Sequence, residues 1–292
     1  MDNIIVLCVF AALILSVWLL PAVYPVVAVM LIAGLTAYAG YMSFSSWIVL
    51  MILAITGYQL LQQDGKRNIL LRLNILLIVF WALWSEDFQA SIISWTNYFQ
   101  MLTVKYPIVV QVTFEKYFAA ILLAAYVLKP RINLNYWRRG FSGTWEVLLL
   151  LYIVLLIPLT VILYMFSGLR IGHLSLVQLI FSLIIICFTE EILYRMILQN
   201  WCYQILRGYS RSLASWLAIV IVSLIYALFH IELGPMVVVI YFFIGSAYGY
   251  VYQKSGKIEV AILVHFAVRL TFGLVVAFYA HNYAHINPLL IN

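Results

Sequence analysis

Apolar segments long enough to cross a bilayer recur along this chain and are separated by short polar connections. A helix needs about 20 apolar residues to cross the hydrocarbon core. Backbone polar groups in lipid must bond within their own segment, so such segments are expected to be helical. The predicted spans cover residues 3–20, 22–40, 45–61, 69–84, 112–128, 144–166, 174–197, 213–230, 236–253 and 259–280. The pattern predicts an all-α protein, a polytopic transmembrane helical bundle of about 8–10 spans.

The composition supports the same class. Of the 292 residues, 66% are hydrophobic and 9% are charged, and the mean hydropathy is +1.08. A water-soluble domain of this length could not cover its surface with so few charges. Segment 3–20 lacks the basic flank of a secretory signal peptide, so we expect it to remain as an anchor. The three cysteines, Cys8, Cys187 and Cys202, lack metal-type spacing and predict buried thiols rather than disulfides.

Charged residues lie mostly in the connections, and their sign alternates. One set of connections holds Lys66, Arg67, Lys129, Arg131, Arg138, Arg139, Arg207, Arg211, Lys254 and Lys257. The opposite set holds Glu86, Asp87, Lys105, Arg170 and Glu232. The positive-inside rule places the first set in the cytoplasm. The net charge of +6 therefore predicts an integral protein of the plasma membrane whose basic loops meet the cytoplasm and anionic membrane lipids, with no nucleic-acid partner.

The basic loop 129–145 divides the chain into two predicted domains. Residues 1–142 carry transmembrane helices whose polar residues show no convergent pattern, and we assign them no role. Residues 143–292 carry the remaining spans and every chemically unusual residue. A functional site is therefore expected in the second domain.

Two adjacent carboxylates, Glu190 and Glu191, interrupt the strongly apolar stretch "CFTEEILYRMIL" at residues 187–198. Nearly all the other acids lie in connections or at the ends of spans. A charged side chain near mid-membrane costs roughly 2.5–3.5 kcal/mol on insertion scales. Intramembrane acids are for this reason functional candidates by default.

α-Helical spacing assigns these acids different roles. Glu191 and Arg195 lie four residues apart with the acid first, the favourable order for an ion pair, and this predicts structural support. Glu190 lies about 100° around the helix from Glu191, on the face of Tyr194 and Cys187. A carboxylate buried in an apolar span, as Glu190 is expected to be, can act as a general base or acid near neutrality. The alternative is that Glu190, Glu191 and Arg195 form one ionic network that joins helices.

Two histidines lie in later apolar spans. His230 ends "IVIVSLIYALFH", and His265 lies in "EVAILVHFAVRL" with Arg269 one turn further along. A lone intramembrane histidine can serve simply as a hydrogen-bonding group between helices. Together with Glu190, these histidines have the residue types to bind Zn²⁺ with a position open for water, or to activate water without a metal.

The predicted depths of these three residues disagree. Counting about 1.5 Å per residue from the basic ends places Glu190 and His265 about 10 Å deep, but His230 about 28 Å deep. They could share a water molecule only if the helix that ends at His230 starts deeper, tilts or is broken.

These residues resemble the signature of the CAAX-protease and bacteriocin-processing (CPBP, or Abi) family of intramembrane proteases. The matching residues are Glu190, Glu191 and Arg195 for EExxxR, Tyr226 and His230 for FxxxH, and His265 and Arg269 for HxxxN. Tyr226 replaces the usual Phe, and Arg269 replaces the usual Asn. Gly245 and Gly249 between the last two motifs fit close helix packing. The resemblance covers residues 172–272.

The resemblance implies endopeptidase cleavage of peptides or small membrane proteins at or within the membrane. Carried over, Glu190 activates the water with help from His230, and His265 binds a metal or stabilises the oxyanion. If zinc is used, its ligands would be Glu190, His230 and His265. Arg269 could stabilise an oxyanion more strongly than Asn, but it would also repel a metal dication.

Two other functions fit the same residues. Intramembrane Glu and His also form proton relays in transporters, although the sequence shows no inverted repeat and no pair of broken helices. Alternatively, a CPBP-fold protein whose site is altered by Arg269 could bind and regulate another membrane protein. An aspartyl dyad is excluded because Asp2, Asp64 and Asp87 all lie outside the strong apolar spans.

Overall fold

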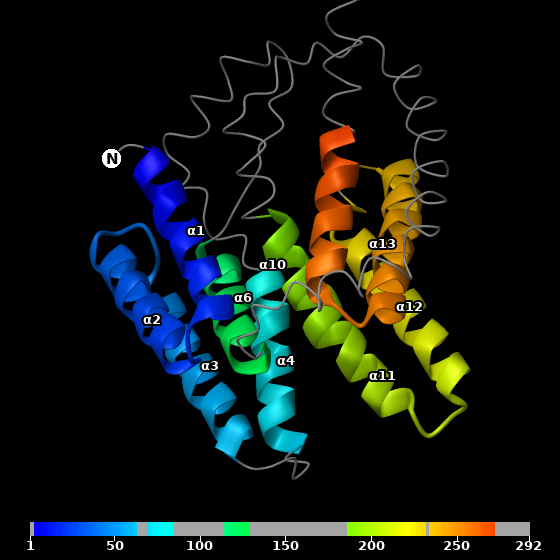
Figure 1. Ribbon diagram of the computed structural model, residues 1–292, viewed down its shortest axis with the longest axis horizontal. Coiled ribbons are helices and arrows are strands. Elements are labelled where there is room, and N and C mark those ends of the chain that lie inside the picture. The colour runs from blue at the N-terminus through cyan, green and yellow to red at the C-terminus, as the bar shows by residue number, and fades with distance from the viewer. Residues whose placement is uncertain (1–2, 63–68, 85–113, 129–185, 232–233, 272–292) are drawn as a thin grey trace, which may run out of the picture. The chain divides into compact units, whose positions relative to one another are not determined.

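The computed structural model describes residues 3–62, 69–84, 114–128, 186–231 and 234–271 (Figure 1). These residues form helices and no strand, which confirms the predicted all-α class. The chain forms two compact units. Of the described residues, those up to Leu193 belong to the first unit and those from Tyr194 onward belong to the second. The predicted domain boundary at 142–143 and the predicted span 144–166 lie outside the described residues.

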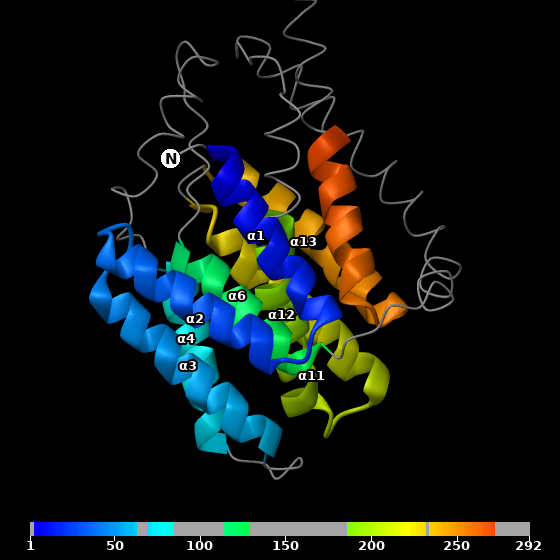
Figure 2. The same ribbon diagram turned by 60° about the vertical axis from the view of Figure 1, so that its left-hand side comes forward.

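The first unit is built around one buried helix. It contains α1 (Asn3–Leu19), α2 (Val23–Tyr38), α3 (Phe44–Gln62), α4 (Ile69–Trp84) and α6 (Phe114–Val127). Helix α6 packs against the other four, and Figure 2 shows α2 and α3 running side by side at its flank. From Glu115 to Ala125 every residue of α6 except Lys116 is buried. Its many alanines let neighbouring helices approach closely from several sides.

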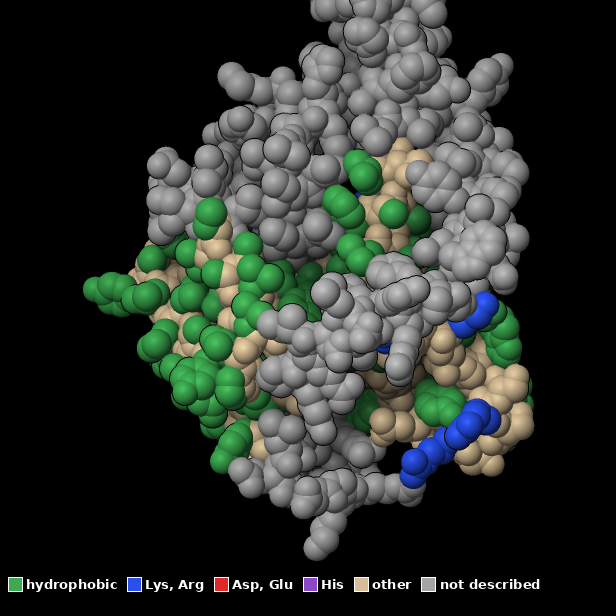
Figure 3. Space-filling model, viewed as in Figure 1, with side chains coloured by type: hydrophobic (Ala, Val, Ile, Leu, Met, Phe, Trp, Pro, Cys, Tyr) green, Lys and Arg blue, Asp and Glu red, His purple; other side chains and the backbone are tan. Residues whose placement is uncertain are grey.

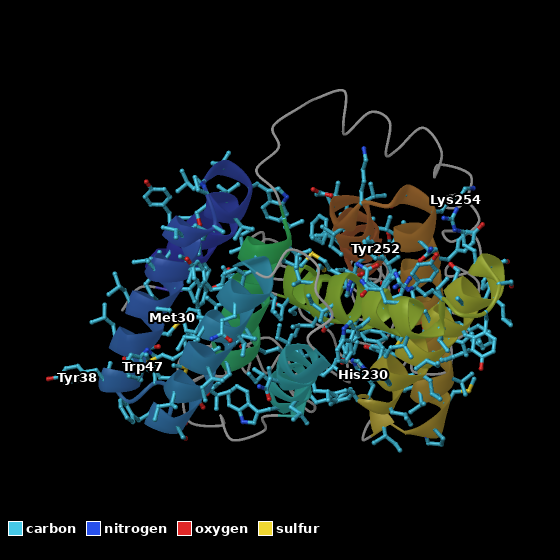
Figure 4. All side chains as sticks on the ribbon, turned by 90° about the horizontal axis from the view of Figure 1, so that it is seen from below. Met30, Tyr38, Trp47, His230, Tyr252 and Lys254 are labelled. Atoms are coloured by element: carbon cyan, nitrogen blue, oxygen red, sulfur yellow. The ribbon has the colours of Figure 1, made fainter. Side chains whose placement is uncertain are left out.

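Long-range hydrogen bonds from aromatic side chains to backbone carbonyls join these helices. The Tyr117 hydroxyl donates to the carbonyl of Phe10 over 2.9 Å, and the Tyr126 hydroxyl donates to the carbonyl of Ala54 over 2.6 Å. The indole of Trp47 donates to the carbonyl of Met30 over 3.4 Å (Figure 4). A buried hydroxyl or indole N–H needs such a partner, so these aromatic residues are tied to specific helices.

Hydrophobic side chains cover much of the face of the first unit seen in Figure 3. Leu15, Val27, Leu31, Leu35 and Leu77 are each more than half exposed. Apolar surface of this extent is unusual on a protein in water and typical of one that faces lipid. Among the described residues, the helices Arg211–Leu228 and Pro235–Ser255 are long and apolar enough to cross a membrane, and the other apolar helices are shorter.

One continuous helix carries the EExxxR residues. It comprises α10 (Phe188–Glu190), the π-helix η2 (Glu191–Gln199) and α11 (Asn200–Leu206). The prediction that this span ends at 197 is wrong, because the helix continues to Leu206. The assumption of α-helical spacing is also wrong here. A π-helix bonds residue i to i+5 and holds more residues per turn, and such segments occur frequently at functional sites.

The second unit continues with α12 (Arg211–Leu228), α13 (Pro235–Ser255) and a further helical segment at 258–271. Ser210 caps α12, because its Oγ accepts a hydrogen bond from the backbone N–H of Leu213 over 3.3 Å. Gly234, with φ of +102°, makes the turn that precedes Pro235 at the start of α13. Gly256, with φ of +65°, ends α13 in the left-handed conformation typical of a helix C-cap.

These three helices pack in sequence order. Helices α12 and α13 lie against each other, with the rings of Trp216 and Tyr250 stacked 5.5 Å apart. Segment 258–271 packs on α13 through a cluster of Tyr248, Val251, Val260 and Val264. Tight turns thus bring the two histidine-bearing elements, the end of α12 and segment 258–271, against the helix α13 that lies between them in the chain.

The structure places His230 just beyond α12 rather than inside it. Helix α12 ends at Leu228, and His230 lies in the turn that follows. The ring of Tyr194 contacts the rings of Tyr226 at 5.1 Å and Phe229 at 6.3 Å. The helix that carries Arg195 therefore runs beside the histidine end of α12. Because the EExxxR helix continues to Leu206, the same count places Glu190 about 24 Å deep, near the count for His230, while the count for His265 is unchanged.

Candidate functional site

Both carboxylates of the EExxxR motif are buried. Glu190 is 8% exposed and Glu191 is 1% exposed, and they belong to the first unit. Within that unit α10 packs against α6, and Phe188 contacts Trp18 with ring centroids 5.6 Å apart. The predicted ion pair of Glu191 with Arg195 stays a prediction. So does the meeting of Glu190 with the two imidazoles.

Arg195 is buried among aromatic and glycine residues of the second unit. It is 1% exposed, and its guanidinium carbon lies 5.7 Å from the centre of the Tyr226 ring, within the range of a cation–π contact. Helix α13 makes room for it at two glycines. A Cβ atom at Gly245 would lie 3.4 Å from one terminal nitrogen of Arg195, and one at Gly249 would lie 3.4 Å from the other. The prediction that these glycines allow close helix packing is confirmed.

We expect Gly245→Ala to destabilise the protein by about 1–3 kcal/mol, the usual cost of overpacking. The added methyl group would lie 2.9 Å from the Tyr226 ring and 3.5 Å from the backbone of Ser223, so helices α12 and α13 would have to separate. The measurement is thermal unfolding in detergent. The matched control is Gly208→Ala, because a Cβ at Gly208 would meet no atom within 4 Å. Equal unfolding temperatures for the two variants would contradict the packing argument.

Tyr226 is the aromatic centre of this unit. Besides Arg195 and Tyr194, its ring contacts the His230 ring at 5.1 Å and the Tyr241 ring at 5.8 Å. It is 2% exposed, so its neighbours enclose it. This is the residue predicted to support the site, and the structure brings it against both Arg195 and His230.

His230 is held in one orientation by two contacts. Its Nδ1 lies 2.9 Å from the carbonyl oxygen of Tyr226, and its ring stacks on Tyr241 at 3.9 Å with an interplanar angle of 27°. A carbonyl oxygen can only accept a hydrogen bond, so Nδ1 carries the hydrogen. In the neutral ring the lone pair is then on Nε2.

His265 is held in a similar way but through its other nitrogen. It is 1% exposed and stacks on Tyr248 at 4.4 Å with an interplanar angle of 23°. The Nε of Arg269 donates a hydrogen bond to Nε2 of His265 over 3.1 Å. Arg269 therefore lies directly against the imidazole that precedes it by one helical turn.

The two imidazoles stack against different turns of α13. They stack on Tyr241 and Tyr248, which are two turns of α13 apart, or about 10 Å along the helix axis. Ligands of one zinc ion each lie about 2 Å from it. Within the described parts of the chain, no three His, Cys, Asp or Glu residues are grouped so that they could hold a metal. The use of zinc stays a prediction.

Three residues that support the site were not identified from the sequence. Tyr241 and Tyr248 lie under the two imidazoles, and the amide of Gln199 donates to the carbonyl of Gly249 over 2.9 Å while completely buried. The spacing of these residues in the sequence could have identified them. The two tyrosines are seven residues apart on one face of α13, and Gln199 follows Arg195 by four residues.

Comparison with known protein families found a match to residues 172–271. A family model described as Type II CAAX prenyl endopeptidase Rce1-like matches this range, which contains all the candidate residues. No curated protein and no solved structure matches the chain. The family implies a membrane-embedded protease of the CAAX type that acts on a peptide or protein substrate. Residues 172–271 thus match the Rce1-like family model, which confirms the resemblance to the CPBP family of membrane proteases that their three motifs carry.

Proposed function

We propose that this protein is an intramembrane endopeptidase in which Glu190 and His230 activate a water molecule for hydrolysis of a peptide bond. The observation that carries the proposal is the orientation of His230. Its Nδ1 is bonded to the Tyr226 carbonyl and its ring is stacked on Tyr241, so the basic nitrogen is Nε2. An imidazole with a set tautomer and ring plane can orient a water molecule by accepting a hydrogen bond at Nε2.

Each residue then has one task in the reaction. Glu190 takes a proton from the water as the water oxygen attacks the scissile carbonyl carbon, and His230 orients that water through Nε2. The carbonyl oxygen becomes an oxyanion, which His265 stabilises by donating a hydrogen bond. The proton then passes from Glu190 to the amide nitrogen as the C–N bond breaks, leaving a carboxylic acid, which ionises to a carboxylate in water, and an amine. Burial of Glu190 at 8% exposure supports its role, because bulk water has little access to the carboxylate.

The substrate we propose to test first is a peptide that ends in a prenylated CAAX sequence, since the matching family model carries that description. Nothing in this chain specifies a prenyl group. The unprenylated peptide and a short transmembrane peptide are therefore needed beside it. Cleavage of all three would indicate a general membrane endopeptidase.

We expect the purified protein in liposomes to cleave at least one of these peptides, and to keep its rate in the presence of a metal chelator. Resistance is expected because the imidazoles stack two turns of α13 apart and Nε2 of His265 accepts from Arg269. The measurement is mass spectrometry of the products, with elemental analysis for zinc. Loss of cleavage with EDTA and recovery with Zn²⁺ would show that the metal-dependent alternative is correct.

Absence of cleavage would favour one of the other functions. Biological activity that survives Glu190→Ala would indicate a binding or regulatory role. Proton flux through liposomes that depends on Glu190 would indicate a carrier.

A further inference from the structure

The bond between Arg269 and His265 determines which nitrogen of this imidazole carries a hydrogen. The Nε of Arg269 donates to Nε2 of His265 over 3.1 Å. A guanidinium has only donors, so Nε2 has to accept. The neutral ring then carries its hydrogen on Nδ1. An imidazolium, with hydrogens on both nitrogens, could not accept this bond.

The packing around His265 holds the ring in the orientation that this bond requires. The imidazole and the ring of Tyr248 are stacked at 4.4 Å, and each residue is 1% exposed. Val260 and Val264, on the same helical segment as His265, pack against Tyr248 and Val251 of α13. Because this interior is closely packed, a ring flip would require the two helices to move apart.

We infer that Arg269 is a positioning residue that holds His265 in its Nδ1–H form, so that His265 acts as a hydrogen-bond donor and not as a base. The positive charge of the Arg269 guanidinium, which lies beside Nε2, also polarises the imidazole ring and strengthens Nδ1–H as a hydrogen-bond donor. The two histidines then have different roles because different groups bind their ring nitrogens. The partner of His230 is a carbonyl, which leaves a basic nitrogen, whereas the partner of His265 is a cation, which leaves a donor.

The test is NMR of the full-length protein labelled with ring-¹⁵N histidine, with the His265 signals identified by their loss in His265→Gln. We expect the wild-type ring to be protonated on Nδ1 alone. Arg269→Lys should keep this form, because ammonium also only donates. Arg269→Gln, whose amide can accept as well as donate, and Arg269→Leu should lose the exclusive preference.

A wild-type His265 protonated on Nε2, or on both nitrogens, would overturn the inference. So would an unchanged Nδ1–H form in both Arg269→Gln and Arg269→Leu. If Arg269→Leu does not fold, the wild-type spectrum and the Arg269→Gln variant still decide the matter.

The expected effect of Arg269 on kcat rests on the proposed function, whereas the assignment of the His265 tautomer does not. We expect Arg269→Leu to lower kcat by about 10- to 100-fold at unchanged KM, the range seen for groups that orient an imidazole through its second nitrogen, with partial recovery in Arg269→Lys. Equal kcat in Arg269→Leu and the wild type would overturn the positioning role. A wild-type protein that shows the Nδ1–H form but cleaves nothing would contradict the proposed function and leave the tautomer assignment standing.

Discussion

Glu190→Gln is expected to lower kcat for peptide cleavage by about 100- to 10,000-fold, the contribution usual for general acid–base catalysis. Glutamine has almost the same shape as glutamate but cannot take up a proton from water. Because Glu190 is 8% exposed, an isosteric amide should fit its site without a cavity. The measurement is the initial rate of product formation by the purified variant in liposomes.

The matched control for this variant is Glu115→Gln. Glu115 is an equally buried carboxylate, 1% exposed on α6, but it lies outside the three motifs. We expect this control to cleave at the wild-type rate per folded molecule. If Glu190→Gln is folded and retains the wild-type rate, Glu190 is not the group that activates water.

His230→Asn is expected to fold normally and to lower kcat by a similar factor, about 100-fold or more. The asparagine amide nitrogen occupies nearly the position of Nδ1, so it can keep the bond to the Tyr226 carbonyl that His230 makes over 2.9 Å. Asparagine offers nothing at the position of Nε2. The variant therefore separates the structural nitrogen from the basic one. The measurements are kcat and the thermal unfolding midpoint.

The comparison variant for His230 is His230→Gln, which cannot match the Nδ1 position as closely. We expect it to lose both activity and stability, because the Tyr226 carbonyl would lose its partner near the end of α12. An active His230→Asn would show that the essential nitrogen is Nδ1 or that His230 is purely structural. Either result would require a different residue to orient the water.

Local features of the chain were sufficient to predict most of the helices and to single out the candidate residues of the site. The runs that became α1, α2, α3, α4 and α13 were predicted to within about two residues, because a helix in lipid must be continuously apolar along its whole length. The end of the EExxxR helix was missed. The stretch from Gln199 to Leu206 contains polar residues, which resemble a connection in a hydropathy pattern although the backbone remains helical.

The sequence by itself determined that buried acids and two histidines belong to an all-helical membrane protein, because composition, apolar length and motif order are local properties. Only the tertiary structure decided the orientation of each imidazole. His230 is oriented by Tyr241 and the Tyr226 carbonyl, and His265 is oriented by Tyr248 and Arg269. A histidine can donate or accept at either nitrogen, so its role depends on which partner the fold places against it.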